Sequence, residues 1–379
     1  MLIYVGTYTE PILFGTGKVL KGNGEGIYVF RMDPASGALE PVSTVTGVVN
    51  PSFLALDDTR RFLYAVNELK SYQDKPTGTV SAFAVDGATG NLSFLNKQPT
   101  HGTDPCHVTI DAKRHHVFVA NFMSGSVCVL PVHHDGGLKE ACQVIQHQGS
   151  GPDPVRQSGP HAHSVTLDRG GRYAYVPDLG LDKLFIYRFD AARGVLEPND
   201  TPWIRTEPGS GPRHLALHPG GRFAYLINEL NATVTAMAID GATGVPREMQ
   251  IVSTVPKGFI GENTCAGVRL TPSGEFLYAS NRGHDSIAIF RVDHHTGRLE
   301  QGGHVATEGK TPRGFGIDPN GEFLLVANQD SDSIVTFRIE KVTGMPRPTG
   351  HITHVPTPVC VTFSPAVAAR STGGQAWPR

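Results

Sequence analysis

The sequence lacks the features that mark several large classes of protein. Its five cysteines are scattered and form no Cys-x-x-Cys pair, which argues against a disulfide framework and a structural zinc site. No apolar run reaches membrane-spanning length, and the N-terminus has no basic region followed by a long apolar stretch. A formal net charge of −2 without a basic tract gives no support for binding to nucleic acid or to a membrane surface. These absences predict a cytoplasmic protein.

Glycine and proline are abundant instead, with 44 and 28 copies in 379 residues. Without a short repeating period, this composition indicates many turns and therefore many short strands. One unit recurs along the chain: an alternating apolar stretch, a second that often ends in Asn, a third, a turn that often has the form Asp-x-x-x-Gly, and a last alternating stretch. The first stretch of each copy begins near Pro51, Pro105, Ala162, Pro212, Cys265, Pro312 and Pro358.

Strands of this kind in repeats of 46 to 57 residues are typical of propeller blades. The N-terminal copy lacks a first strand, whereas residues 359–363 form a first strand without a following copy. Pairing the two would close a ring and remove its exposed edges. The sequence therefore predicts an all-β fold, a seven-bladed β-propeller of four-stranded antiparallel blades over residues 1–365, followed by a flexible tail at 366–379.

Two sets of aligned positions should surround the central channel on one face, because first strands begin there and second strands end there. The first set is Ser52, Cys106, His163, Arg213, Ala266, Arg313 and Val359; the second is Tyr8, Glu68, Phe122, Asp178, Glu229, Arg282 and Gln329. Charges of both signs gather on the fourth to seventh blades, with His161 and His214 nearby. Any one of them could be a solvated ion pair, but their clustering on a concave surface indicates a small-molecule site.

The sequence gives less support to a metal site, a phosphate-binding loop or a serine nucleophile. His161 and His163 would share one face of a strand and could suggest a metal, but the spacing fixes no third ligand. The glycine clusters at 149–151 and 209–211 precede strands, whereas a phosphate-binding loop needs a helix N-terminus. No Gly-x-Ser-x-Gly motif is present. We therefore expect neither a metal nor a cofactor.

Five motifs in order resemble the lactonase-type seven-bladed propellers: Tyr4–Thr9, Pro160–Ser164, Pro212–Leu215, Ile227–Leu230 and Ser280–Gly283. That family includes the bacterial propeller form of 6-phosphogluconolactonase and the fungal carboxy-cis,cis-muconate lactonising enzymes. The resemblance implies a histidine at His163, an acid at Glu229 and arginines at Arg213 and Arg282, with Arg313 competing for the last role. His161, His214, Asp178 and Glu68 are further candidates for substrate binding, and whether His161 or His163 faces the pore stays open.

These residue types suit the hydrolysis of a small anionic lactone. His163 could take a proton from water, and Glu229 could orient that imidazole or protonate the leaving oxygen. Arginine forks match phosphate or carboxylate groups. The first expectation is hydrolysis of 6-phosphogluconolactone. A carboxymuconate cycloisomerase would use the same residues to close a lactone, and a non-catalytic binding platform, the third alternative, would need an apolar patch around the same face.

Overall fold

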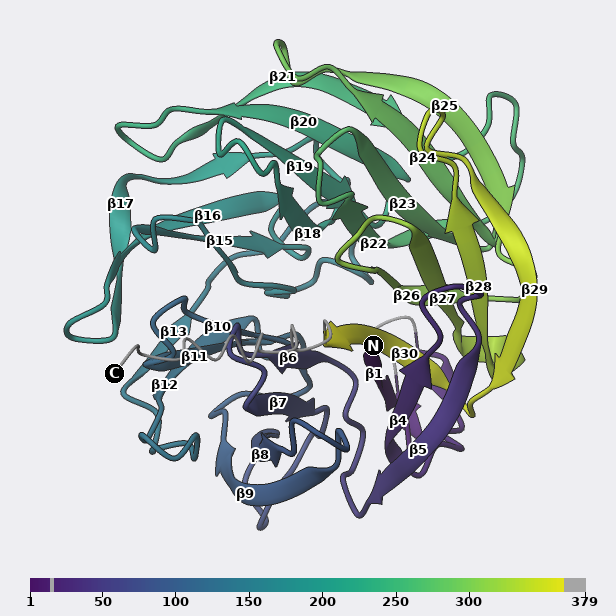
Figure 1. The fold of residues 1–379 in the computed structure, drawn as a ribbon. Coiled ribbons are helices and arrows are strands. Elements are labelled where there is room, and N and C mark those ends of the chain that lie inside the picture. The colour runs from purple at the N-terminus through teal and green to yellow at the C-terminus, as the bar shows by residue number, and fades with distance from the viewer. Residues whose placement is uncertain (14–16, 365–379) are drawn as a thin grey trace, which may run out of the picture.

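Seven four-stranded sheets stand around a central axis in the computed structural model (Figure 1), which describes residues 1–13 and 17–364. Within every sheet, neighbouring strands are antiparallel. At five of the seven junctions between blades, the described inner strands contact each other around the axis. The predicted seven-bladed propeller is therefore confirmed, whereas the predicted tail at 366–379 lies outside the described residues.

The strands of each blade run from the axis outward. Blade 1 contains β30 (Pro358–Ser364), β1 (Leu2–Thr7), β4 (Gly26–Met32) and β5 (Leu39–Thr46); blade 2 contains β6 (Leu54–Leu56), β7 (Phe62–Asn67), β8 (Thr79–Val85) and β9 (Leu92–Pro99). Blade 3 contains β10 (Pro105–Ile110), β11 (His116–Asn121), β12 (Ser126–Pro131) and β13 (Gln143–Gln146); blade 4 contains β14 (Thr166–Leu167), β15 (Tyr173–Asp178), β16 (Lys183–Asp190) and β17 (Val195–Arg205).

The remaining three blades follow the same order. Blade 5 contains β18 (Pro212–Leu217), β19 (Phe223–Asn228), β20 (Thr233–Ile239) and β21 (Pro246–Ser253); blade 6 contains β22 (Thr264–Leu270), β23 (Phe276–Arg282), β24 (Ser286–Val292) and β25 (Leu299–Ala306). Blade 7 contains β26 (Pro312–Ile317), β27 (Phe323–Asn328), β28 (Ser333–Ile339) and β29 (Pro346–His354). A short hairpin of β2 (Ile12–Leu13) and β3 (Val19–Leu20) and a 3-10 turn (Gln329–Ser331) lie outside the blades.

Blade 1 joins the two ends of the described chain. β30 pairs with β1 from Leu2 opposite Ser364 to Thr7 opposite Pro358. Figure 1 shows the yellow strand β30 beside the purple strand β1. The predicted closure of the ring by the strand at residues 359–363 is confirmed.

Apolar side chains fill the space between neighbouring sheets. Seven clusters of buried residues lie at the seven interfaces between blades. In five blades a buried tyrosine of the second strand also donates a hydrogen bond to a glycine carbonyl in the outer turn of the next blade, as Tyr225 Oη does to Gly297 O at 3.0 Å. The other four pairs are Tyr4 with Gly90, Tyr64 with Gly136, Tyr175 with Gly244, and Tyr278 with Gly344.

The inner strands are irregular at one repeated position. The pairing register shifts just after the first residue of β10, β18 and β26, at Cys106, Arg213 and Arg313, and similar shifts occur in β22 and between β30 and β1. Such a β-bulge re-aims the side chain that it carries. Five of the seven positions of the first aligned set therefore lie on bulges, whereas Ser52 and His163 precede the first strands of their blades.

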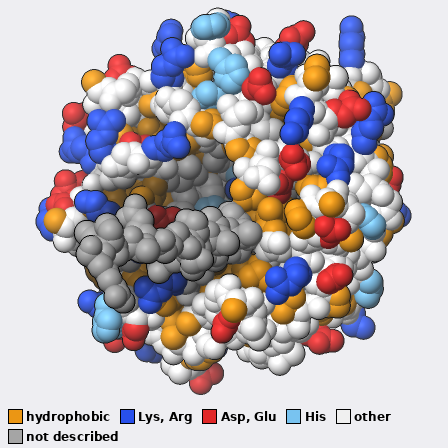
Figure 2. Space-filling view, viewed as in Figure 1, with side chains coloured by type: hydrophobic (Ala, Val, Ile, Leu, Met, Phe, Trp, Pro, Cys, Tyr) orange, Lys and Arg blue, Asp and Glu red, His pale blue; other side chains and the backbone are white. Residues whose placement is uncertain are grey.

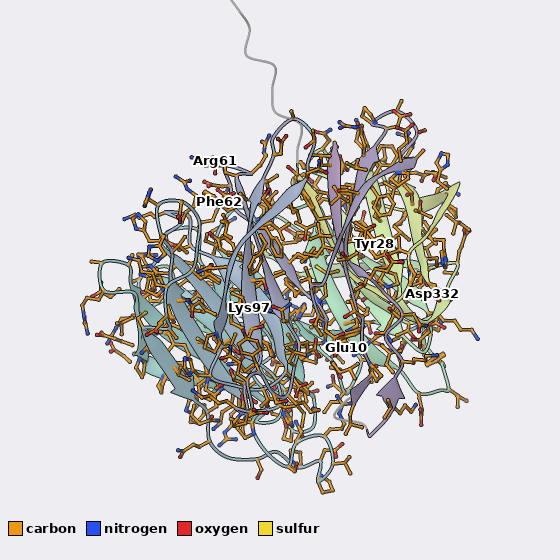
Figure 3. The ribbon with its side chains drawn as sticks, turned by 90° about the horizontal axis from the view of Figure 1, so that it is seen from below. Glu10, Tyr28, Arg61, Phe62, Lys97 and Asp332 are labelled. Atoms are coloured by element: carbon orange, nitrogen blue, oxygen red, sulfur yellow. The ribbon has the colours of Figure 1, made fainter. Side chains whose placement is uncertain are left out.

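The two ends of the blades form the two faces of the ring. Figure 2 shows one face, which is hollowed toward its centre and carries charged side chains on its outer loops. Seen from the edge in Figure 3, Arg61 and Phe62, at the start of β7, lie toward the opposite end of the blades from Glu10, which follows β1. None of the described residues form a helix that is both long and apolar enough to cross a bilayer.

Candidate active site

A cavity of about 430 Å³ opens on the face where the second strands end. Its wall includes His163, Glu229, Arg282, Arg313 and Glu68, which come from five different blades. The volume lies within the range of roughly 300–1,000 Å³ that is usual for sites of small molecules. The structure therefore brings together most of the charged residues that the repeat alignment predicted to converge.

Glu229 directly follows β19 and binds three guanidinium groups. Its Oε2 lies 2.9 Å from Arg213 Nε and 3.0 Å from Arg282 Nη2, and its Oε1 lies 2.6 Å from Arg156 Nη2. Burial alone would raise the pKa of Glu229, but Arg282, Arg156 and Arg213 together hold it well below its usual range. This carboxylate therefore stays ionised, so it can organise the arginines but has no proton to donate.

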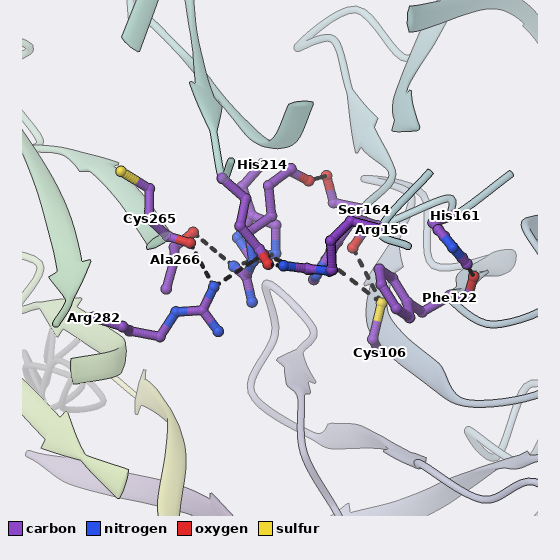
Figure 4. A network of polar contacts seen from close by, with 12 residues as sticks. Cys106, Phe122, Arg156, His161, Ser164, His214, Cys265, Ala266 and Arg282 are labelled. Carbon is purple, nitrogen blue, oxygen red and sulfur yellow. Dashed lines mark hydrogen bonds and ion pairs between the residues drawn. The ribbon is translucent and has the colours of Figure 1, made fainter. Parts of the chain in front are cut away.

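Two of these arginines are also fixed to the backbone of blade 6. Arg213 Nη1 donates to Ala266 O at 2.6 Å, and Arg282 Nη2 donates to Cys265 O at 2.7 Å. Figure 4 shows these contacts meeting in one network that runs from Arg282 to Cys106. The positive charge of the site is therefore set in place before any ligand binds.

His163 lies beside this cluster in a buried setting. Its Nε2 is 4.0 Å from Glu229 Oε2, and its Nδ1 is 3.6 Å from Cys106 Sγ. Burial and the charge of Arg213 hold the pKa of His163 well below its usual value, although Glu229 opposes them. Burial also raises the pKa of the Cys106 thiol, so at neutral pH a neutral imidazole stands beside a protonated thiol.

A second acidic group lies in another part of the cavity wall. Tyr8 Oη donates to Glu68 Oε2 at 3.0 Å, and the Arg313 guanidinium lies 5.5 Å from the centre of the Tyr8 ring. Burial raises the pKa of Glu68 even though the nearby charge of Arg313 lowers it. Glu68 is therefore easier to protonate than Glu229, although both are buried.

The structure places four of the predicted residues outside the main cavity wall. Arg213 and His214 line a narrow space of about 30 Å³ further along the channel, where Arg213 Nη1 lies 3.3 Å from His214 Nε2. His161 and Asp178 line neither space. Arg213 reaches the site through its contact with Glu229, whereas His214 contacts Arg213 and packs edge-on against the His163 ring, with 5.2 Å between the ring centres.

His161 and Asp178 instead hold the chain between blades 3 and 4. Asp178 Oδ1 accepts the His161 backbone N–H at 2.7 Å, and Asp178 Oδ2 lies 2.7 Å from His147 Nδ1. The His161 ring stacks on Phe122, and its Nδ1 lies 3.0 Å from Phe122 O. Of the two histidines left open by the sequence, His163 is the one that lines the cavity; His161 and Asp178, which were also predicted to bind substrate, do not line it.

No three His, Cys, Asp or Glu side chains within the described ranges 1–13 and 17–364 lie in an arrangement suited to a metal ion. His161 and His163, the pair that could have suggested such a site, have different partners, Phe122 O and Cys106 Sγ. The cavity wall instead offers arginines, which suit an anionic organic ligand.

Comparison with known proteins agrees with the seven-bladed fold. The family described as "Lactonase, 7-bladed beta-propeller" matches residues 2–363. The chain belongs to this lactonase family.

Among its relatives, 6-phosphogluconolactonase of Bacillus subtilis is 37% identical over 312 residues, which cover 82% of this chain and 83% of the relative. A protein named 6-phosphogluconolactonase from Formosa agariphila is 35% identical over 319 residues, covering 83% and 85%. The structure of the periplasmic gluconolactonase PpgL of Pseudomonas aeruginosa superposes with a TM-score of 0.89 at 35% identity, covering 97% of this chain and all of that chain (100%).

The sequence interpretation of this lactonase-family chain missed Arg156. This residue lies in the connector between β13 and β14 and contributes one of the three guanidinium groups on Glu229. The repeat alignment could not find it, because the connector has no counterpart in other blades. A signal did exist, since the interval between Pro105 and Ala162 is, at 57 residues, the longest in the sequence.

Proposed function

We propose that this chain hydrolyses the lactone of an anionic sugar acid, with 6-phosphogluconolactone as the first candidate. One observation carries the proposal: a neutral, buried imidazole and a fixed group of guanidinium ions share one cavity in a member of the lactonase family. The names of two relatives support the phosphorylated substrate, and that of the Pseudomonas protein supports an unphosphorylated one.

The chemistry follows from the charge states of the site. His163 accepts a proton from a water molecule as that water adds to the lactone carbonyl carbon. The carbonyl oxygen becomes an oxyanion, which Arg282 or Arg313 can stabilise from the cavity wall. When the intermediate collapses, the ring C–O bond breaks and the proton on His163 passes to the leaving oxygen.

Glu229 supports this sequence without transferring a proton. Its charge lies 4.0 Å from His163 Nε2 and stabilises the imidazolium that forms during the reaction. It also keeps Arg213 and Arg282 in place. Of the two roles expected from the sequence, protonation of the leaving oxygen is disfavoured because Glu229 stays ionised, and at 4.0 Å Glu229 acts on His163 through its charge rather than through a hydrogen bond.

The test is to compare 6-phosphogluconolactone, unphosphorylated gluconolactone and 3-carboxymuconate as substrates, after subtraction of the uncatalysed rate. We expect rapid hydrolysis of a gluconolactone and its loss in the His163→Gln variant. Consumption of carboxymuconate alone would favour lactone formation instead. Failure of a folded wild-type protein to turn over any of the three would overturn the proposal and favour a binding platform.

A further inference from the structure

The three arginines on Glu229 are not held equally. Arg213 and Arg282 each donate a second hydrogen bond to a backbone carbonyl, at Ala266 and Cys265. The Arg156 side chain bonds to Glu229 and, among the described residues, to no other group. Moving Arg213 or Arg282 would leave a carbonyl without its donor, which is costly in a buried place, whereas moving Arg156 would not.

The backbone that carries Arg156 is nevertheless well fixed. Asp153 Oδ1 accepts the backbone N–H groups of Val155 and Arg156 at 2.8 and 2.9 Å. Gln157 Nε2 donates to Leu179 O at 2.8 Å and to Asp182 Oδ1 at 2.7 Å. The side chain of Arg156 can therefore change its partner without a rearrangement of the connector.

The charges of the site also favour such a change. Three guanidinium groups surround a single carboxylate, so the cluster carries an excess of positive charge. Arg156 and Glu229 both line the cavity, and the Arg156 side chain is 15% exposed. An anionic group that enters the cavity can therefore reach Arg156 and offer it the same bidentate geometry that a carboxylate offers.

We propose that Arg156 is the specificity residue of this site: it leaves Glu229 and binds the anionic phosphate group of the incoming lactone. The inference rests on the proposed function for the identity of the substrate. Arg213 and Arg282 stay on Glu229 during the exchange and keep the carboxylate ionised. Unphosphorylated lactones leave the Arg156–Glu229 pair intact, so they make no direct contact with this residue.

The experiment measures the binding of 6-phosphogluconate, gluconate and inorganic phosphate by isothermal titration calorimetry. Arg156→Gln should weaken 6-phosphogluconate binding about tenfold or more, because a charged contact is lost, and leave gluconate binding within about twofold. Arg156→Lys should restore part of the loss. Arg188→Gln is the matched control, because Arg188 forms its ion pair with Asp200 on the surface, at 2.6 Å.

Kinetics supply a second readout. In Arg156→Gln, kcat/KM for 6-phosphogluconolactone should fall at least about tenfold more than kcat/KM for gluconolactone, because both lactones lose the support that Arg156 gives Glu229 but only the phosphorylated one loses a direct contact. Equal effects on both lactones, or no effect on either, would overturn the inference and leave the proposed function standing. Arg156-dependent binding of 6-phosphogluconate without turnover of any lactone would overturn the proposed function and leave the role of Arg156 in phosphate binding standing. If none of the three anions binds the wild-type protein, the inference is wrong.

Discussion

At the scale of residues, the two buried glutamates of the cavity have opposite surroundings. Glu229 contacts three guanidinium groups, whereas Glu68 accepts a hydrogen bond from a tyrosine hydroxyl and lies near the charge of Arg313. Accordingly the pKa of Glu229 is lowered and that of Glu68 is raised. Environments that separate the pKa values of like groups are a feature of catalytic sites.

Removing the charge of Glu229 should destabilise the fold. In Glu229→Gln the arginines lose their shared counter-ion, and loss of one partner from a buried ion pair costs about 3–5 kcal/mol. Urea unfolding followed by circular dichroism measures the loss. Glu68→Gln is the control, with an expected cost of about 1 kcal/mol or less, because its surroundings already disfavour the charge. An equal or smaller loss in Glu229→Gln would contradict the assigned role of this carboxylate.

The lowered pKa of His163 predicts the pH dependence of the reaction. A general base works only when unprotonated, and His163 becomes protonated only well below the usual histidine value of about 6.5. The kcat/KM for the lactone should therefore stay constant from pH 7.5 down to about 6. Initial rates corrected for spontaneous hydrolysis test this. An acidic limb with a midpoint at or above about 6.5 would show that His163 is not the base.

At the scale of elements, a tyrosine links the second strand of one blade to the outer turn of the next. Gly297, which accepts from Tyr225, has a φ of 71°. Its missing side chain makes room for the Phe223 ring, because a Cβ there would overlap that ring. The Asp-x-x-x-Gly turn thus serves the interface between blades as well as the connection between strands.

Loss of one such link should weaken the protein modestly. Tyr225→Phe keeps the packing and removes the donor to Gly297 O, so the free energy of unfolding should fall by about 0.5–1.5 kcal/mol. Thermal unfolding of the variant and of Tyr72→Phe, whose hydroxyl makes a side-chain contact with Gln73, measures the difference. A Tyr72→Phe variant that loses as much as Tyr225→Phe would argue against a special role for the link.

The strands and turns that recur in every blade could be predicted from the sequence, because each blade buries its sheet with the same alternation of apolar and polar residues. The prediction was wrong for residues that lie outside the repeated strands or at their ends. His161 and His163 were expected on one face of a strand, but β14 begins only at Thr166, so the rule of alternation does not apply to them. Asp178 occupies the aligned position of Glu229, yet its carboxylate accepts the backbone N–H groups of His161 and Gly180.

The role of Arg156, in the connector between β13 and β14, could not be predicted from the repeats for a related reason. Arg156 meets Glu229 across 73 positions of sequence, and only the folded ring determines that distance. Likewise, the bulges that re-aim Cys106, Arg213 and Arg313 leave no clear sign in the alternation of apolar residues. The charged residues at the aligned positions could be predicted, whereas Arg156 and the division between cavity wall and supporting residues could not.

At the scale of the whole molecule, the ring depends on β30. Ending the chain at Pro356 removes β30, which leaves β1 as an open edge and takes Val361 from the cluster that contains Ile3 and Val5. We expect this truncation to aggregate or to lose cooperative unfolding. Size-exclusion chromatography and thermal circular dichroism test this, with a chain ending at Ala369 as the control. A soluble, cooperatively folding protein ending at Pro356 would refute the need for closure.

The composition of blade 1 from distant parts of the chain also has a consequence for folding during synthesis. Residues 358–364, the inner neighbour of residues 2–7, leave the ribosome more than 350 residues after them. At synthesis rates of about 5–20 residues per second, β1 waits for tens of seconds without this partner. Tyr8 and Arg313, which contact each other in the cavity wall, are likewise about 300 positions apart in the sequence. A nascent chain that ends before β30 therefore lacks the inner strand of blade 1, and β1 stays an open sheet edge until β30 emerges.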